Sequence, residues 1–137
     1  MFRSVIVFAF CASPAVADTS MVQRLAGFYG DPPPSVAPCK GVQQQLSFWD
    51  RNNRGTVQVF EHRDGEGKSI ILDLPFTVRR STARGLETRF DNEEFHTGSG
   101  ELVTWEFRPL RSPAGYCWHR TDWTDAACIN TVQRCED

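Results

Sequence analysis

The sequence predicts an all-β domain, an antiparallel meander of about eight strands that closes into a small barrel. Three observations predict it. Short segments alternate apolar and polar residues, as T-V-Q-V-F-E does at 56–61. Turn clusters such as Asn-Asn-Arg-Gly at 52–55 separate these segments at intervals of about 8 to 15 residues. No long helical period interrupts them, so the strands pair mainly with their neighbours in the chain.

Residues 1–17 have the three parts of a cleavable signal peptide. Arg3 supplies the positive charge, residues 4–12 are an uncharged, largely apolar stretch, and Ala15-Val16-Ala17 is an A-x-A cleavage site. The apolar stretch is far shorter than the roughly 20 residues that a membrane span needs, and no later segment is longer. We expect cleavage after Ala17, export to the periplasm or beyond, and one domain over 18–137.

Cysteine content supports export. The chain has five cysteines, and Cys11 lies within the expected leader. The other four, at Cys39, Cys117, Cys128 and Cys135, form an even set without a C-x-x-C zinc knuckle. An even set of cysteines in an exported chain predicts disulfides, here two.

Charge excludes one class of partner. The chain has 15 basic and 17 acidic residues, with a formal net charge of −2. Nucleic-acid-binding proteins normally carry a basic face, which this balance does not supply. The length suffices for one hydrophobic core, which the disulfides supplement.

The first elements are short. Residues 20–26, S-M-V-Q-R-L-A, predict one or two helical turns, and Gly27 ends them. An extended segment begins at Phe28. Residues 31–38, D-P-P-P-S-V-A-P, hold four prolines, which predicts a stiff connecting loop that ends at Cys39.

Alternating segments then follow one another. Pro75 is expected to end one strand, and residues 109–115 are expected to form a turn. The expected strands cover 46–49, 56–61, 70–74, 85–90, 102–107 and 116–120, with a brief extended piece at 93–97 and a segment at 76–78 that continues past Pro75 or forms a strand of its own.

The tail predicts a short C-terminal helix. Cys128, Val132 and Cys135 stand at i, i+4 and i+7, with Thr124 or Asp125 as cap. Cysteines seven apart on a helix are separated by about 10.5 Å along its axis and cannot bridge each other. Both must then pair with Cys39 and Cys117. A strand at 117–123 followed by a returning helix would bring Cys135 back toward Cys117, which favours Cys39–Cys128 and Cys117–Cys135. If the tail is a loop, Cys128–Cys135 with Cys39–Cys117 is the alternative.

The order of elements resembles the lipocalin and wider calycin families. A helical turn leads into Gly27-Phe28-Tyr29, where those families have Gly-x-Trp, and a meander and a C-terminal helix follow. In length the chain is similar to small bacterial calycins and to barrel-shaped periplasmic inhibitors of proteases and lysozyme. The resemblance implies a barrel that holds a small ligand or blocks an enzyme.

Aromatic residues are the main candidates for function, because they are many for so small a core. The leading expectation is a non-enzymatic protein that binds a small apolar or amphiphilic ligand inside the barrel. The expected lining residues are Phe48, Trp105, Phe107 and Trp118. The rival is an inhibitor that binds a protein through exposed aromatic residues or the proline-rich loop, with Trp49, Trp123 and Pro33 as contacts.

Catalytic and metal motifs are weaker. The chain has no H-E-x-x-H or G-x-S-x-G motif, and we expect neither an enzyme nor a cofactor. Glu94 and His96 share one strand face, so convergence with His119 would indicate a metal site or a small hydrolase.

Overall fold

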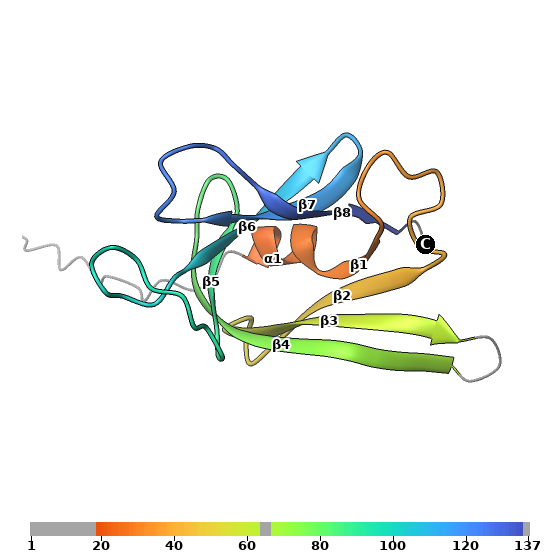
Figure 1. Cartoon of the computed structure of the whole chain (residues 1–137), viewed down its shortest axis with the longest axis horizontal. Coiled ribbons are helices and arrows are strands. Elements are labelled where there is room, and N and C mark those ends of the chain that lie inside the picture. Colours follow the sequence, from red (N-terminus) through yellow and green to blue (C-terminus); the bar gives the residue numbers. More distant parts are fainter. Residues whose placement is uncertain (1–18, 64–66, 136–137) are drawn as a thin grey trace, which may run out of the picture.

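The computed structural model describes residues 19–63 and 67–135, so the expected leader at 1–17 lies outside the described residues. Eight strands form a closed antiparallel barrel in sequence order, and β1 pairs with both β2 and β8 (Figure 1). The predicted barrel is therefore confirmed. The elements are α1 Thr19–Leu25, β1 Gly27–Gly30, β2 Val42–Trp49, β3 Arg54–Arg63, β4 Gly67–Ser81, β5 Leu86–Phe90, β6 Trp105–Arg111, β7 Ala114–Arg120 and β8 Ile129–Arg134.

Alternation along the strands sorts side chains between the interior and the outer face. In β5, Leu86, Thr88 and Phe90 are buried, whereas Glu87 and Arg89 between them are partly exposed. A strand turns successive side chains to opposite faces of its sheet, so one period-two segment supplies both surfaces.

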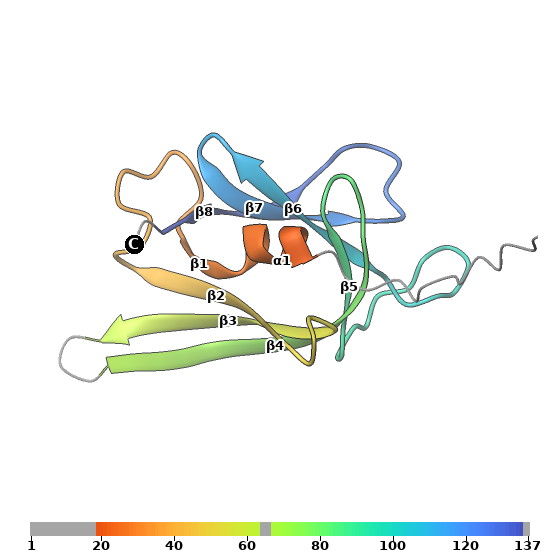
Figure 2. The same cartoon turned by 180° about the vertical axis from the view of Figure 1, so that it is seen from behind.

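Helix α1 belongs to the core. Its apolar residues Met21, Val22 and Leu25 are almost fully buried among the inward-facing side chains of the strands. Both views show the helix between β2–β3 and β6–β8 (Figures 1 and 2). Tyr29 donates a hydrogen bond to the Leu25 carbonyl, and Arg134 of β8 donates one to the Ala26 carbonyl. The end of the helix is therefore tied to the first and last strands.

Aromatic rings pack around Phe107. Its ring centroid lies 5.3 Å from that of Phe76, 5.6 Å from Tyr116 and 5.5 Å from Trp118, and its side chain has no solvent exposure. Tilted and edge-to-face arrangements of this kind are favourable for aromatic pairs. Together with α1, these rings fill the centre of the barrel.

The predicted C-terminal helix is wrong, because residues 129–134 form strand β8. β8 pairs with β7 and with β1 and thereby closes the barrel. Without it, both of those strands would leave edge N–H and C=O groups unpaired. Ile129, Thr131 and Val132 are β-branched residues that suit a strand, so the demand for closure prevails over the helical spacing.

Both predicted disulfide pairings are also wrong. The bridges are Cys39–Cys135 and Cys117–Cys128, with Cα–Cα distances of 5.8 and 5.7 Å. The antiparallel register places Trp118 opposite Ile129, which brings Cys128 beside Cys117. Cys135 follows β8 and donates its backbone N–H to the Phe28 carbonyl, close to the loop that carries Cys39. Because the tail is extended, each cysteine meets the partner across its own strand pairing.

The proline-rich loop 31–41 returns closely on β1. The Asp31 N–H bonds to the Pro38 carbonyl at 2.8 Å. A Cβ added to Gly30 would lie 1.8 Å from that same carbonyl oxygen, so only glycine permits this close approach. The loop is therefore held at both ends, by this contact and by Cys39.

The observed strands and turns differ from the expected ones at three places. Pro75 lies within β4 instead of ending it, and its carbonyl accepts a bond from the Asp91 N–H across the bend. Pro109 lies within β6, so the turn is shorter than expected. Among residues 93–102, pairing is limited to one bridge between His96 and Leu102. None of the described helices is both long and apolar enough to cross a lipid bilayer.

Candidate functional site

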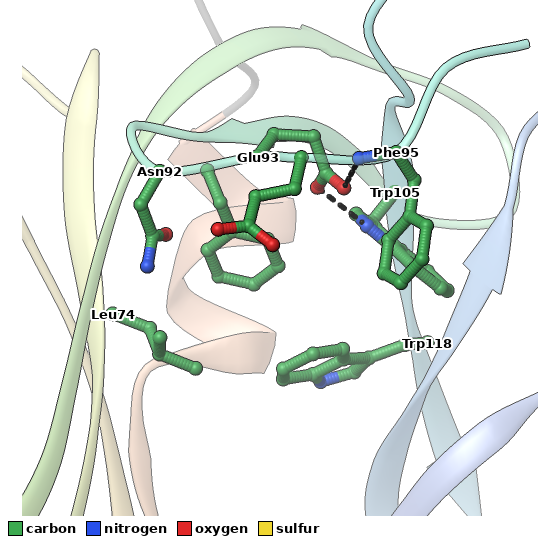
Figure 3. A pocket seen from close by; sticks show the side chains of 8 residues that line it. Leu74, Asn92, Glu93, Phe95, Trp105 and Trp118 are labelled. Atoms are coloured by element: carbon green, nitrogen blue, oxygen red, sulfur yellow. Dashed lines mark hydrogen bonds between the residues drawn. The ribbon is translucent and has the colours of Figure 1, made fainter.

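A pocket of about 320 Å³ opens beside the last residue of β5, and we call it the tryptophan pocket (Figure 3). Its apolar wall comes from β4, β5, β6 and β7, and its polar rim from the loop after β5. The lining residues are Leu74, Phe90, Asn92, Glu93, Glu94, Phe95, Trp105 and Trp118.

The loop after β5 positions the rim. The Asp91 N–H bonds to the Pro75 carbonyl at 3.0 Å, and the Glu93 N–H bonds to the Phe90 carbonyl at 3.2 Å. These bonds turn the chain back over the end of the barrel, so Asn92 and Glu93 stand above the aromatic wall (Figure 3). Because backbone hydrogen bonds already hold this loop in place, the rim loses little conformational entropy when a ligand binds.

The two rim glutamates differ. Glu93 accepts hydrogen bonds from the Trp105 indole N–H at 3.0 Å and from the Phe95 backbone N–H at 3.3 Å. Glu94 lines the same pocket, but its carboxylate makes no hydrogen bond or ion pair within the described part of the chain. One carboxylate therefore orients a ring of the pocket, and the other is available to a ligand.

Trp118 separates this pocket from a second one of about 280 Å³, which we call the rear pocket. Leu74 and Trp118 line both. The indole N–H of Trp118 is buried and makes no hydrogen bond of normal geometry in the described structure, although its interaction with the Tyr116 hydroxyl partly offsets the effect of burial on the pKa of that hydroxyl. The neighbouring Tyr116 hydroxyl, whose pKa is raised by burial, donates its own proton to Gln44 of the rear pocket.

Two of the four predicted ligand-binding residues line the tryptophan pocket, namely Trp105 and Trp118. Phe107 is wholly buried in the core, and Phe48 packs against Phe76 at 5.7 Å and lines neither pocket. Neither of the two pockets described above, among residues 19–63 and 67–135, is lined by Phe48 or Phe107. Helix α1, which the sequence placed only before the barrel, is one of the elements that fill the centre of the barrel.

Sequence reasoning missed Leu74, Phe90 and Glu93 as pocket residues, and it considered Glu94 only as a residue of a metal site or small hydrolase. Alternation places Phe90 on the same strand face as Leu86 and Thr88. The pair Glu93-Glu94 directly after an inward aromatic was the available signal, but it also fits an ordinary solvated turn.

The residues expected to bind a protein do not form one surface. Trp49 is 45% exposed at the end of β2, and Arg54 lies over its ring at 6.0 Å. Trp123 is half-buried rather than exposed, and its ring packs on Trp105 at 5.8 Å. Pro33 lies in the loop before β2, at the opposite end of that strand from Trp49.

Glu94, His96 and His119 do not converge. Within 19–63 and 67–135, no three His, Cys, Asp or Glu side chains are grouped to hold a metal ion. Glu94 is at the rim of the tryptophan pocket. His119 is buried on β7, and its Nδ1 lies 2.6 Å from the Ala127 carbonyl oxygen.

Comparisons with known proteins add no identification. Protein-family models, curated proteins and solved structures give no match to this chain. The closed eight-stranded antiparallel barrel is compatible with a calycin-like fold, and the functional argument rests on the residues of the barrel itself.

A buried ion pair lies on the outer face of β6. Glu106 opposes His119 across the β6–β7 pairing. It accepts hydrogen bonds from Arg108 Nε at 2.5 Å and from the Thr82 hydroxyl at 2.8 Å. Burial alone would raise the pKa of Glu106, but these bonds and the nearby charges of Arg108 and Arg84 outweigh it and lower that pKa.

The Glu106→Gln variant is expected to lose less stability in acid than the wild type. A carboxyl whose pKa is lower in the folded state stabilises the fold above its ordinary pKa of 4.5. That contribution disappears as the pH falls through the folded-state value. Urea unfolding at several pH values between about 6 and 3 measures the difference. Glu101→Gln, at an exposed position, is the control, and equal acid sensitivity of the two variants would contradict the assignment.

Proposed function

We propose that this protein is an exported, non-enzymatic binding protein that holds a small amphiphilic molecule in the tryptophan pocket. The apolar part of the ligand packs against Leu74, Phe90 and Trp118. A cationic or hydrogen-bond-donating head lies at the rim, next to Glu94. The leader-like segment 1–17 and the two disulfides support export to an oxidising compartment.

One observation carries the proposal: an aromatic pocket lies under a carboxylate that the protein leaves without a partner. The Glu94 side chain has no ion pair or hydrogen bond in the described residues, although Arg and Lys are available elsewhere in the chain. A carboxylate beside indole rings favours a cation, because ring faces and carboxylates both attract positive charge. Small-molecule sites commonly combine such an apolar lining with a few placed polar groups.

The volume of the pocket limits the ligand. A pocket of about 320 Å³ lies at the lower end of the usual range of roughly 300–1,000 Å³. Because α1 and the rings around Phe107 fill the centre, a long chain has no straight path through the barrel.

Intrinsic tryptophan fluorescence tests the proposal directly, because Trp105 and Trp118 line the pocket. We expect saturable changes with decyltrimethylammonium, used as a monomer, and weaker binding of decyl sulfate. Glu94→Gln should weaken binding of the cation by up to about fivefold, the effect of one exposed charge pair. Decyl maltoside has the same alkyl chain and an uncharged head, so its binding measures the contribution of the alkyl chain without a charge.

Two matched substitutions on β4 separate the pocket from nonspecific adsorption. Leu74→Trp places a bulky side chain in the pocket and should abolish binding of the cation. Ile71→Trp adds the same ring at an exposed position of the strand and should leave binding unchanged. Equal binding by both folded variants, or a preference for the sulfate, would disprove the proposal.

A second candidate function is inhibition of another protein through loop 31–41. Val36 is fully exposed at this loop, and Cys39–Cys135 anchors the loop to the barrel. A loop held in place loses little entropy on docking. Native mass spectrometry of the protein isolated from its own host distinguishes the two functions, since a retained amphiphile favours the first and a stoichiometric protein partner the second.

A further inference from the structure

The outer face of the barrel holds a second, polar pocket of about 440 Å³, which we call the outer pocket. One wall is the turn between β4 and β5, and the other is the loop 121–128 that precedes β8. The floor is formed by β6 and β7. Figures 1 and 2 show the turn and the loop side by side at the same end of the barrel. This pocket is separate from the tryptophan pocket, with which it shares no lining residue.

Both walls are held firmly. In the turn, the Thr82 N–H bonds to the Gly85 carbonyl at 2.8 Å, and the Thr82 hydroxyl accepts the Gly85 N–H at 3.0 Å. The loop is closed by Cys117–Cys128, and its Thr121 N–H bonds to the Thr104 carbonyl at 3.0 Å. The space between the walls is therefore a built feature of the fold.

Most charges in the outer pocket neutralise one another. Arg80 forms a two-pronged ion pair with Glu87, at 2.7 and 3.0 Å. Glu106 is occupied by Arg108 and the Thr82 hydroxyl. The charges of Arg80, Glu87, Glu106 and Arg108 are therefore paired within the pocket.

Two charges of opposite sign remain, one on each wall. The Arg84 guanidinium, on the turn, makes no hydrogen bond or ion pair within the described residues, although its charge helps to lower the pKa of Glu106. Asp125, on the loop, accepts one backbone N–H from Ala127 at 3.0 Å and faces no cation of its own. An anion alone would be repelled by Asp125 and a cation alone by Arg84.

The floor offers a hydrogen-bond acceptor. His119 is 6% exposed, and its Nδ1 lies 2.6 Å from the Ala127 carbonyl oxygen. A carbonyl can only accept, so Nδ1 carries the proton of this contact, and the ring nitrogen left to accept a hydrogen bond is Nε2. Nε2 has no partner among the described residues. The Trp123 ring packs edge-on against His119 at 5.9 Å and adds an apolar wall.

We propose that the outer pocket binds a small zwitterion of the α-amino acid class, with its carboxylate at Arg84 and its ammonium between Asp125 and His119 Nε2. Arginine offers a paired donor geometry that matches a carboxylate. An ammonium carries three donors, which the Asp125 carboxylate and the His119 lone pair both accept. A side chain of the ligand packs against Trp123.

Two-dimensional ¹H–¹⁵N NMR titration of the full oxidised protein with individual L-amino acids tests this site. We expect saturable shifts of the Trp123 indole N–H with at least one amino acid, with a dissociation constant of about 1 mM or tighter. The N-acetyl derivative of that amino acid lacks the ammonium group. The carboxamide of the same amino acid keeps the ammonium group but lacks the carboxylate. Both should bind at least about tenfold more weakly, because each loses a charge-assisted hydrogen bond.

Three variants complete the experiment. Arg84→Gln and Asp125→Asn should each weaken binding at least about tenfold, and both positions are exposed loop sites where the fold tolerates change. Arg79→Gln removes an exposed arginine of β4 outside the pocket and should bind normally. The proposal is overturned if no L-amino acid gives saturable shifts, if the amide or N-acetyl form binds equally, or if Arg79→Gln acts like Arg84→Gln.

Discussion

Replacing Cys39 and Cys135 together by serine is expected to lower the free energy of unfolding by about 4–5 kcal/mol. The bridge joins residues 96 apart in sequence, so its loss frees nearly the whole domain in the unfolded chain. It also releases loop 31–41 from the end of β8, next to the β1–β8 pairing that closes the barrel. Urea unfolding under oxidising conditions, followed by far-UV circular dichroism, measures the change.

The matched variant replaces Cys117 and Cys128, whose separation is 11 residues. The loop-entropy relation predicts a smaller loss of about 3 kcal/mol. The two double variants have the same composition, so their difference isolates the effect of loop length. Equal losses, or a larger loss for the Cys117–Cys128 variant, would contradict this account and would indicate that strain or residual structure decides the stability.

Phe107→Ala is expected to destabilise the protein by about 3–5 kcal/mol. The ring is fully buried and contacts Phe76, Tyr116 and Trp118, so its removal leaves a cavity that rigid neighbours cannot fill. Natural domains are stable by only about 5–15 kcal/mol in total, so this variant should be close to unfolding at room temperature. Its urea midpoint and its near-UV circular dichroism report the loss.

Phe95→Ala is the matched control. The same ring is removed, but Phe95 is 62% exposed at the rim of the tryptophan pocket. Its effect on unfolding should stay within about 0.5 kcal/mol, as for most surface substitutions. A large loss at Phe95, or a small one at Phe107, would show that the core lies elsewhere.

The candidate site was only partly predictable. Trp105 and Trp118 were both expected to line the interior of the barrel, Trp105 by the alternation of its strand, and both line the pocket. Phe107 follows the same alternation but lies in the core. Alternation of apolar and polar residues predicts which face of a sheet a side chain occupies. Whether that side chain lines a pocket or packs in the core depends on the residues opposite it, which for Phe107 include α1 and Phe76.

The outer pocket shows the same limit for charged residues. Arg84, Glu106, His119 and Asp125 come from four separate segments, and no spacing in the chain connects them. Glu106 and His119 meet because β6 and β7 pair in one register, and the turn and loop meet because both reach over that pair. Long-range contacts of this kind leave no periodic trace in the sequence.

By itself the sequence determined the class of fold, because alternation and turn residues act locally and each strand carries its own signal. Its even set of cysteines likewise indicated two bridges. Only the tertiary structure decided that the tail is a strand, which cysteines pair, and that the helix fills the barrel. Those outcomes follow from closure: the edges of β1 and β7 need a partner, β8 supplies it, and its antiparallel path brings each cysteine to its bridge.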